Sequence, residues 1–406
     1  MTIVINDPQE SKEFLNAILD NMESAVLLLD ADMRIHHVNR RFQELFRHSG
    51  ENVVGICCGN ALSCGHAVEE NVTCGKSSRC AECGLRAAAK QALTGEIPKR
   101  SRLVRRFYLR GTPERKHLDF CCRPMNYRGR NMVLAVLHDV TELEEHRLGL
   151  LEHKERLEID LRSAALIQKS LLPQPGLRFP GLELSWRFRP SEAVGGDMFN
   201  IFRLDTRRVG LFLLDVCGHG VSAAMMAVSV SRLLSPDAGT VVDVDQSVSP
   251  PERIMERLER EFPFERFGSY FSAQYVILDA VDGSLTYASA GHPPPVLARA
   301  DGRTELLDVH GPVIGLDAGL PFPAGQARLE PGDRLYLYTD GIPERRGSDG
   351  SLFGEERLTR LLSTDAGQTL EQAVDAVFAQ TLAFGASAPA DDICLLGVER
   401  KLLNIT

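Results

Sequence analysis

The 406-residue sequence has no long apolar segment. A membrane helix needs about 20 consecutive apolar residues, and no apolar run in the chain approaches that length. The opening residues, MTIVINDPQE, also lack the basic start and the apolar core of a secretory signal. We therefore expect a cytoplasmic protein that does not enter a membrane.

The sequence also lacks an excess of basic residues. Its formal net charge is -9, and the acidic excess lies after residue 150. Nucleic-acid binding depends on Lys and Arg side chains that neutralise phosphates, so we expect no nucleic-acid partner. An acidic domain can instead hold divalent cations, although a solvated acidic surface would give the same composition.

Proline is absent and glycine occurs once between residues 141 and 172, which predicts one long helix that ends before Pro173. Apolar residues recur every seven positions along it, at Leu143, Leu150, Leu157, Ala164 and Leu171. A coiled coil needs a second apolar position in each repeat, and here that position is mostly polar: it holds Arg147, Lys154, Leu161 and Gln168. The pattern fits a two-stranded coiled coil, which would make a homodimer, and also a helix lying on its own domain; we favour the dimer.

The part before this helix predicts a small α+β domain. A helix from residue 12 precedes two strands that are joined at Asp30 and Asp32, and a closing hairpin turns at residues 126–131. The segment LLLDADMRIHHVNRRFQELF, the Val54-Gly55 step and the closing VLHDVTE are similar to a PAS domain over residues 12–142. The resemblance implies a sensory module that binds a ligand or cofactor and often dimerises.

Eight of the ten cysteines lie before residue 123. A cytosolic compartment keeps thiols reduced, so a disulfide framework is not expected. The segments LSCGHA and TCGKSSRCAECG offer enough soft ligands for zinc or an iron–sulfur cluster, from Cys64, Cys74, Cys80 and Cys83. The alternative is that these are free buried thiols. The adjacent pairs Cys57-Cys58 and Cys121-Cys122 fit a shared site less well, and the second pair lies in a predicted strand.

After Pro180 the sequence alternates short apolar strands with glycine-bearing turns and a few helices, which predicts a β-sandwich covered by helices. Aspartates stand at strand ends in AVGGDMFN, LFLLDVCGHG, LYLYTDGIPE and APADDICLL: Asp197, Asp215, Asp340 and the pair Asp391-Asp392. Carboxylates without local thiols select Mg²⁺ or Mn²⁺. One Asp-Gly after a strand is usually only a turn, but four acidic sites in one domain indicate a metal centre.

These motifs, together with GHGVSAAMMA, SAGHPPPVL and LFGEERL, resemble the PPM phosphatase superfamily over residues 162–400. Within it, they are similar to the bacterial branch that controls sporulation and stress-response sigma factors. The resemblance implies two Mn²⁺ or Mg²⁺ ions and a water, activated between them, that attacks phosphoserine or phosphothreonine. It assigns Asp197 to one ion, Asp215 as the bridge, the Val216 carbonyl as a further ligand, and Asp340 with Asp391 or Asp392 to the other ion. Of the last two we prefer Asp391.

The branch further implies a phosphorylated protein substrate, namely an anti-sigma-factor antagonist. The sequence departs from the pattern where Asn200 replaces a usual acid, which could weaken one metal site, and where Cys217 and Cys394 replace Ser and Thr. His219 and His292 are candidate proton donors, although structural roles suit them better. Arg187 and Arg189 are candidates for phosphate binding.

We therefore expect a PAS-like sensor domain at residues 1–142, a helical linker at 143–172 and a PPM-type phosphatase domain at 173–406. The expected function is a metal-dependent serine/threonine phosphoprotein phosphatase under sensor control. One rival is a signalling scaffold of PPM shape that binds its partner without hydrolysis. Another is a metal or redox sensor whose phosphatase-like part is only an output adaptor.

Overall fold

The computed structural model describes residues 8–48, 53–174, 176–242, 247–363, 367–385 and 387–402. The chain divides into two compact units, residues 1–155 and 156–406, and the division falls inside a long helix. The predicted boundaries at residues 142 and 172 stay a prediction. Within the described ranges, no helix is both long and apolar enough to cross a bilayer.

The first unit contains one antiparallel five-stranded sheet in the order β2-β1-β5-β4-β3. Its core consists of apolar side chains from the sheet and from the helices packed on it, including Leu27, Phe42 and Phe120. The predicted hairpin is present, since β4 and β5 join around residues 127–130. The strands are β1 (Ala25–Leu29), β2 (Ile35–Val38), β3 (Ser101–Leu109), β4 (Thr112–Tyr127) and β5 (Arg130–Asp139).

The cysteine-rich segment of this unit folds into several short helices that sequence periodicity did not predict. They are too short to show a helical repeat. The helices of the unit are α1 (Pro8–Asp20), α2 (Arg40–Leu45), α3 (Cys58–Ala61), α4 (Gly65–Glu69), the 3₁₀ helix η1 (Ser78–Glu82) and α5 (Gly84–Leu93).

Helix α6 (Thr141–Ser170) is the long helix that the scarcity of proline and glycine predicts. Its residues 150–160 are exposed throughout, among them Leu150 and Leu157 at 71% and 62%. Near its C-terminal end, by contrast, Gln168 is buried, and Leu171, just past the helix, packs on the core of the second unit. The middle of α6 is thus exposed to solvent, whereas its C-terminal end packs on the second unit.

The second unit contains two antiparallel five-stranded sheets, ordered β13-β10-β9-β8-β7 and β12-β11-β14-β15-β6. The first has β7 (Met198–Arg203), β8 (Arg208–Val216), β9 (Phe271–Asp279), β10 (Ser284–Ala290) and β13 (Ala324–Arg328). The second has β6 (Leu182–Arg189), β11 (Val296–Ala298), β12 (Thr304–Leu306), β14 (Arg334–Tyr338) and β15 (Ile393–Arg400).

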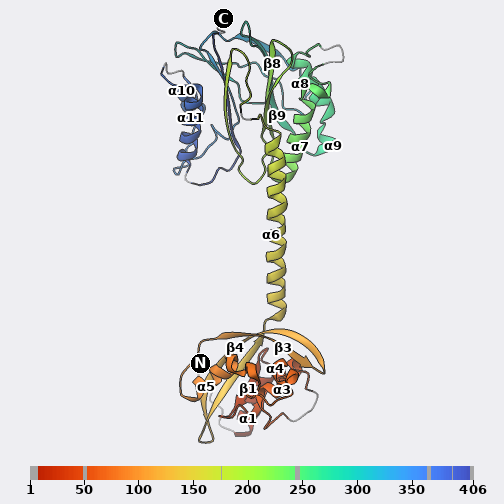
Figure 1. Ribbon diagram of the computed structural model, residues 1–406, viewed down its shortest axis with the longest axis vertical. Helices are drawn as coiled ribbons and strands as arrows, with labels where there is room; N and C mark the ends of the chain where they lie inside the picture. The colour runs from red at the N-terminus through yellow and green to blue at the C-terminus, as the bar shows by residue number, and fades with distance from the viewer. Residues whose placement is uncertain are drawn as a thin grey trace. The chain divides into compact units, whose positions relative to one another are not determined.

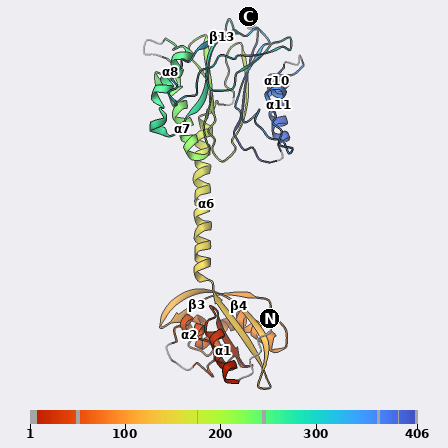
Figure 2. The same ribbon diagram turned by 180° about the vertical axis from the view of Figure 1, so that it is seen from behind.

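Helices cover the outer face of each sheet, as Figures 1 and 2 show. Against the first sheet lie α7 (Gly220–Leu233), the 3₁₀ helix η2 (Pro236–Ala238), α8 (Pro251–Glu261) and α9 (Phe264–Phe267), and against the second lie α10 (Glu355–Leu362) and α11 (Leu370–Phe384). Separate apolar cores fill the space between the sheets and the space under each helical layer. The predicted α+β class, with a helix-flanked β-sandwich, is confirmed.

Candidate active site

Asp197 and Asp215 meet at one edge of the first sheet. Asp197 directly precedes β7 and Asp215 is the penultimate residue of β8. The two strands pair antiparallel with Met198 opposite Leu214, so the register places Asp197 next to Asp215. Asp197 is 1% exposed, and its Oδ2 atom has no hydrogen-bond partner among the described residues.

The second sheet contributes its acids in the same way. Asp340 lies two residues after the end of β14, and Asp391-Asp392 directly precede β15, with Tyr338 opposite Leu395. A Cβ atom at Gly341 would stand 1.9 Å from the Asp392 carbonyl oxygen. The Asp340 turn can therefore approach the Asp392 backbone only because residue 341 is glycine.

The two pairs of acids face each other across the sandwich and disfavour one another's charge. Burial, followed by the charges of Asp340, Asp391 and Asp392, raises the pKa of Asp215 to about 7. Burial and the charge of Asp391 raise the pKa of Asp340 to about 6. Burial, with Asp215 nearby, raises the pKa of Asp197 well above its usual range.

Asp391 and Asp392 differ in what already binds their carboxylates. One Asp392 oxygen accepts from the Ser191 N–H and Oγ at 2.7 and 2.9 Å, and the other accepts from the Asp197 N–H at 3.1 Å. Asp391 is exposed and accepts only from the neighbouring Asp392 N–H, at 2.8 Å. This arrangement favours Asp391 as the ligand and makes Asp392 the residue that holds the Asp197 loop.

The carboxylates fit a divalent cation by charge. In the described part of the chain, no Lys or Arg forms an ion pair with these aspartates, so their negative charge is uncompensated. Buried carboxylates are stable in the charged form only when a cation or hydrogen-bond donors accompany them. No three His, Cys, Asp or Glu side chains within the described ranges are gathered closely enough to hold an ion as they stand.

The loop after β8 places backbone groups beside the acids. The Val216 N–H donates to the Gly196 carbonyl at 3.3 Å, and a Cβ atom at Gly196 would stand 2.7 Å from the Val216 carbonyl oxygen. The Val216 carbonyl thus lies next to the Asp197 loop, and its role as a metal ligand stays a prediction. Gly218 has φ of +101°, which favours glycine, and the loop leads into α7, whose first N–H groups have no side-chain cap.

The two histidines lie in different surroundings. His219 is exposed, and its Nδ1 lies 3.1 Å from a Glu192 carboxylate oxygen. His292 is buried, its Nδ1 lies 2.7 Å from the Ser272 Oγ, and burial lowers its pKa to about 3. A neutral, enclosed His292 suits the structural role and not that of a proton donor.

The sequence analysis also singled out two arginines and two cysteines of this domain, namely Arg187, Arg189, Cys217 and Cys394. Arg187 forms ion pairs with Glu371 and Asp375 on α11, which occupy its guanidinium. Arg189 is exposed at the end of β6, opposite Ile393, and so lies near Asp392. Cys217 is exposed next to Val216, whereas Cys394 is fully buried and its N–H donates to the Thr339 Oγ1 at 3.0 Å.

The structure gives Asn200 and Gln168 roles that the sequence did not predict. The Asn200 side-chain amide donates to the Leu171 carbonyl at 2.8 Å, so it binds the chain just after α6. Gln168 donates to the Gly195 carbonyl at 2.7 Å and accepts from the Gly195 N–H at 3.2 Å. Both contacts join the end of α6 to the segment that carries Asp197.

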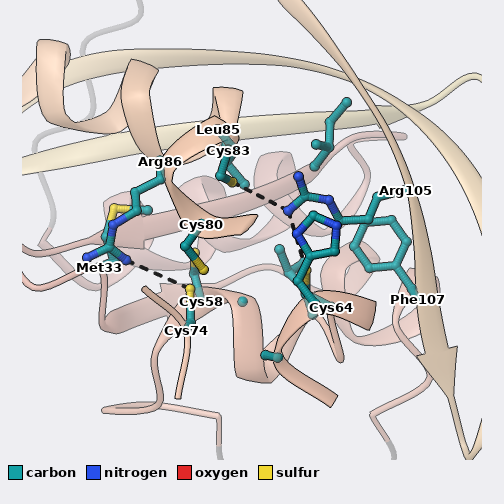
Figure 3. Close-up of a pocket in the computed structure, with 15 residues that line it drawn as sticks. Met33, Cys58, Cys64, Cys74, Cys80, Cys83, Leu85, Arg86, Arg105 and Phe107 are labelled. Atoms are coloured by element: carbon teal, nitrogen blue, oxygen red, sulfur yellow. Dashed lines mark hydrogen bonds between the residues drawn. The ribbon is translucent and has the colours of Figure 1, made fainter. Parts of the chain in front are cut away.

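A second candidate site lies in the first unit, where all four predicted cysteine ligands line one pocket (Figure 3). Cys58 lines it too, although the sequence separated that residue from the cluster. The neighbouring Cys58 thiol is the largest of the effects that lower the pKa of Cys74 to about 6. Of the remaining cysteines before residue 123, none is part of the lining of this pocket.

Taken together, the helix-flanked sandwich and its carboxylate cluster define a PPM-type phosphatase domain, preceded by a sensor-sized α+β domain. Residues 205–401 match the family described as stage II sporulation protein E, and residues 13–78 match a PAS domain family. The second unit thus carries a match to the stage II sporulation protein E family, and the first carries a match to a PAS domain. Both resemblances seen in the sequence are confirmed.

Two curated relatives share the second domain. The chain is 29% identical over 194 residues to phosphoserine phosphatase RsbP of Bacillus subtilis, covering 47% of this chain and 46% of that protein. It is 23% identical over 250 residues to phosphoserine phosphatase RsbU of the same organism, covering 61% of this chain and 72% of that protein. The chain thus spans less than half the length of RsbP.

Among solved structures, the PP2C domain of SiaA from Pseudomonas aeruginosa superposes with a TM-score of 0.53 at 23% identity. The superposition covers 61% of this chain and 98% of that domain. At this identity the likeness shows the fold of the second unit.

Proposed function

We propose that the protein is a cytoplasmic, metal-dependent phosphoprotein phosphatase that acts on phosphoserine or phosphothreonine. The observation that carries the proposal is the uncompensated cluster of Asp197, Asp215, Asp340 and Asp391, formed by the ends of two sheets. Two relatives that share this domain are named phosphoserine phosphatases, which supports the same activity.

In this proposal the four aspartates and the Val216 carbonyl hold two Mn²⁺ or Mg²⁺ ions. Such ions lower the pKa of bound water and offset charge on phosphoryl oxygens. Asp392 holds the Asp197 N–H and so fixes the loop that carries the first ligand. In this proposal the N-terminus of α7, which has no side-chain cap and follows Asp215 in the chain, supplies N–H groups to the phosphoryl oxygens.

The surface beside the acids suits a protein substrate. Val221 and Met225, on the first turns of α7, are 51% and 63% exposed. Exposed apolar side chains of this size beside a reaction site favour docking of another folded protein. We propose a phosphorylated anti-sigma-factor antagonist as that substrate, by analogy with the branch that the sequence resembles.

We further propose that the PAS domain controls the phosphatase through α6 in a homodimer. The exposed leucines of the middle of α6 provide a seam for a second copy, and Gln168 contacts Gly195, two residues from Asp197. A shift at the end of α6 would therefore change the position of a metal ligand.

In the sensor domain, we propose that Cys64, Cys74, Cys80 and Cys83 hold a soft-metal centre, zinc or an iron–sulfur cluster. Their presence around one pocket supports this proposal. Side-chain N–H groups of Arg86 and Arg105 also donate to the sulfurs of Cys74, Cys64 and Cys83. The rival interpretation is that the four cysteines are free thiols.

A comparison of substrate binding with phosphate release tests the proposed activity. The full chain is incubated with a phosphoserine form of the antagonist protein and Mn²⁺, and both quantities are measured on the same sample. We expect release that depends on Mn²⁺. Stable binding of the phosphoprotein without any release would favour the scaffold interpretation.

A further inference from the structure

Two arginines lie directly opposite each other on the outer face of strands β3 and β4 in the PAS domain. Leu103 and Phe107 of β3 are buried in the core, so the alternating Val104 and Arg106 lie on the other face. The strand register pairs Arg106 with Arg115 of β4, and both side chains are exposed. Like charges directly opposite each other destabilise a sheet. The pair is therefore unfavourable unless an anion accompanies it.

Another cross-strand pair on the same face is matched by sign. Arg102 lies opposite Asp119 and donates to its carboxylate at 2.7 Å. Arg102 also forms an ion pair with Glu144 of α6, at 2.6 Å. The guanidinium of Arg115, by contrast, has neither an ion pair nor a hydrogen bond to any residue that the structure describes. The sheet thus neutralises one outward arginine twice and leaves the other without a counter-charge.

A single carboxylate, that of Glu69 on α4, is shared by two arginines here. Its oxygens lie 3.4 Å from Arg106 and 3.9 Å from Arg79 of η1. Charge-assisted hydrogen bonds of this kind are usually about 2.7–2.9 Å long, so neither contact is a close one. The adjacent Glu70 is occupied elsewhere, because it accepts from the Ser78 N–H and hydroxyl at 3.0 and 2.9 Å. The protein itself therefore neutralises these arginines only in part.

The arginines surround a pocket of about 350 Å³, here called the arginine pocket, which is large enough for a small molecule. Gly65 shapes its wall, since a Cβ atom there would stand 2.8 Å from the Arg106 carbonyl oxygen and would push α4 away from β3. Four arginines and one carboxylate give the lining an excess of three positive charges. The titratable side chains of the lining are His66, Glu69, Arg79, Arg105, Arg106 and Arg115.

Guanidinium groups determine what such a pocket can bind. Each can donate two parallel hydrogen bonds to a phosphate or a carboxylate. Arg105 already donates to sulfur atoms of the neighbouring cysteine pocket, so Arg79, Arg106 and Arg115 are the donors left for a ligand. They come from three different elements, η1, β3 and β4, and line one pocket. This arrangement suits an anion with several oxygens and more than one negative charge.

We propose that the arginine pocket binds a small anion with two or more negative charges, a phosphorylated or polycarboxylate metabolite, through Arg79, Arg106 and Arg115. The site lies on the face of the sheet that points away from the apolar core of the PAS domain. The proposal goes beyond the proposed function, because binding can be measured without phosphatase turnover and without metal in either domain.

Calorimetry of the full chain tests the site, with inorganic phosphate and citrate as the two probes. Divalent metal is first removed with a chelating resin, so that phosphate cannot bind through a metal in the phosphatase domain, and sodium chloride keeps the ionic strength constant. We expect saturable binding of at least one probe with a Kd below about 1 mM. Binding of phosphate alone would identify a phosphorylated ligand, and binding of citrate alone a polycarboxylate. Failure of both probes to bind saturably would overturn the proposal.

Variants of the facing arginines locate the bound anion. Arg106→Gln and Arg115→Gln should each weaken binding about 10-fold or more, because one charge-assisted contact is lost. Arg123→Gln is the matched control, since Arg123 is exposed further along the same face of β4, and it should bind like the natural protein. Unchanged binding in both Arg106→Gln and Arg115→Gln would place the anion elsewhere and overturn the proposal.

The unfolding temperature without anion separates a ligand site from a structural role. Arg115→Gln removes the repulsion between the two strands, so the variant should unfold at the same temperature as the natural protein or at a higher one. An arginine that stabilised the fold would give a lower temperature on substitution. A lower unfolding temperature in Arg115→Gln, together with unchanged binding, would contradict the proposed role of this residue.

Discussion

Asp215 lies within reach of the charges of Asp340, Asp391 and Asp392, which together with burial raise its pKa. Asp215→Asn removes its charge at almost constant size. We expect the folded variant to bind Mn²⁺ at least about 100-fold more weakly than the natural protein, as measured by calorimetry. Asp308→Asn, which changes an exposed aspartate, is the control and should bind Mn²⁺ normally.

The raised pKa values of Asp215 and Asp340, about 7 and about 6, also predict a pH dependence of stability. Between about pH 4 and pH 7 the folded, metal-free protein holds more protons than the unfolded chain, so its stability falls as pH rises. We expect the unfolding temperature in EDTA to drop by about 5 °C from pH 5 to pH 8, and Mn²⁺ to restore it.

The fluorescence of Trp186, the single tryptophan, reports unfolding of the second domain because it lies on β6. Asp215→Asn should reduce the pH-dependent drop. A drop of the same size in that variant would show that other groups cause it.

At the residue scale, the sequence predicted what is encoded locally. Asp197, Asp215, Asp340 and Asp391 each stand at a strand end beside glycine or a turn, so their neighbourhood was visible in the chain itself. Asn200 was expected to matter for metal binding, yet its amide binds the Leu171 carbonyl. Neither this contact nor the Gln168–Gly195 contact could be predicted from neighbouring residues, because the two partners lie 29 and 27 residues apart in the sequence.

At the scale of elements, the C-terminal end of helix α6 contacts the segment that carries Asp197. Gln168→Ala removes both hydrogen bonds to Gly195 and so loosens the loop of Asp197. We expect the Mn²⁺ concentration for half-maximal turnover to rise about 10-fold, as for loss of other groups that orient metal ligands. Gln174→Ala is the control, because the Gln174 side-chain amide donates to the Ser170 carbonyl and not to the Asp197 loop. Equal Mn²⁺ dependence of turnover in both variants would show that the end of α6 does not affect the metal site.

The exposed stretch of α6 carries the proposed dimer seam. Leu157→Glu places a charge at a position that is 62% exposed in one chain and would be covered in a pair. We expect analytical ultracentrifugation to show weaker dimers and phosphatase assays to show loss of sensor control. Glu152→Lys, off the seam, should leave the mass unchanged. A Leu157→Glu protein that remains dimeric at low concentration would contradict the seam.

Long or strongly patterned elements were predictable, and short ones were not. The absence of proline identified α6, and apolar runs between glycine turns identified the central strands of both sheets. Helices α3, α4 and η1 have four or five residues each, too few for a periodic pattern, and their arrangement depends on the pocket that they surround.

At the scale of the whole molecule, each domain contains one candidate metal centre of a different chemistry. Hard carboxylate oxygens gather where two sheets end in the phosphatase domain, and soft thiols surround a closed pocket in the PAS domain. In the proposed control, a shift of α6 would reach the loop of Asp197 through the contact of Gln168 with Gly195.

We propose that this carboxylate cluster hydrolyses phosphoserine with the help of divalent metal. The most direct measurement is phosphate release from a phosphoserine protein by the full chain during a Mn²⁺ titration, beside Asp215→Asn and Asp308→Asn. We expect turnover that is absent in EDTA, rises with Mn²⁺ in the natural protein and in Asp308→Asn, and is lost in Asp215→Asn. Turnover in EDTA, or full Mn²⁺-dependent turnover by Asp215→Asn, would contradict it.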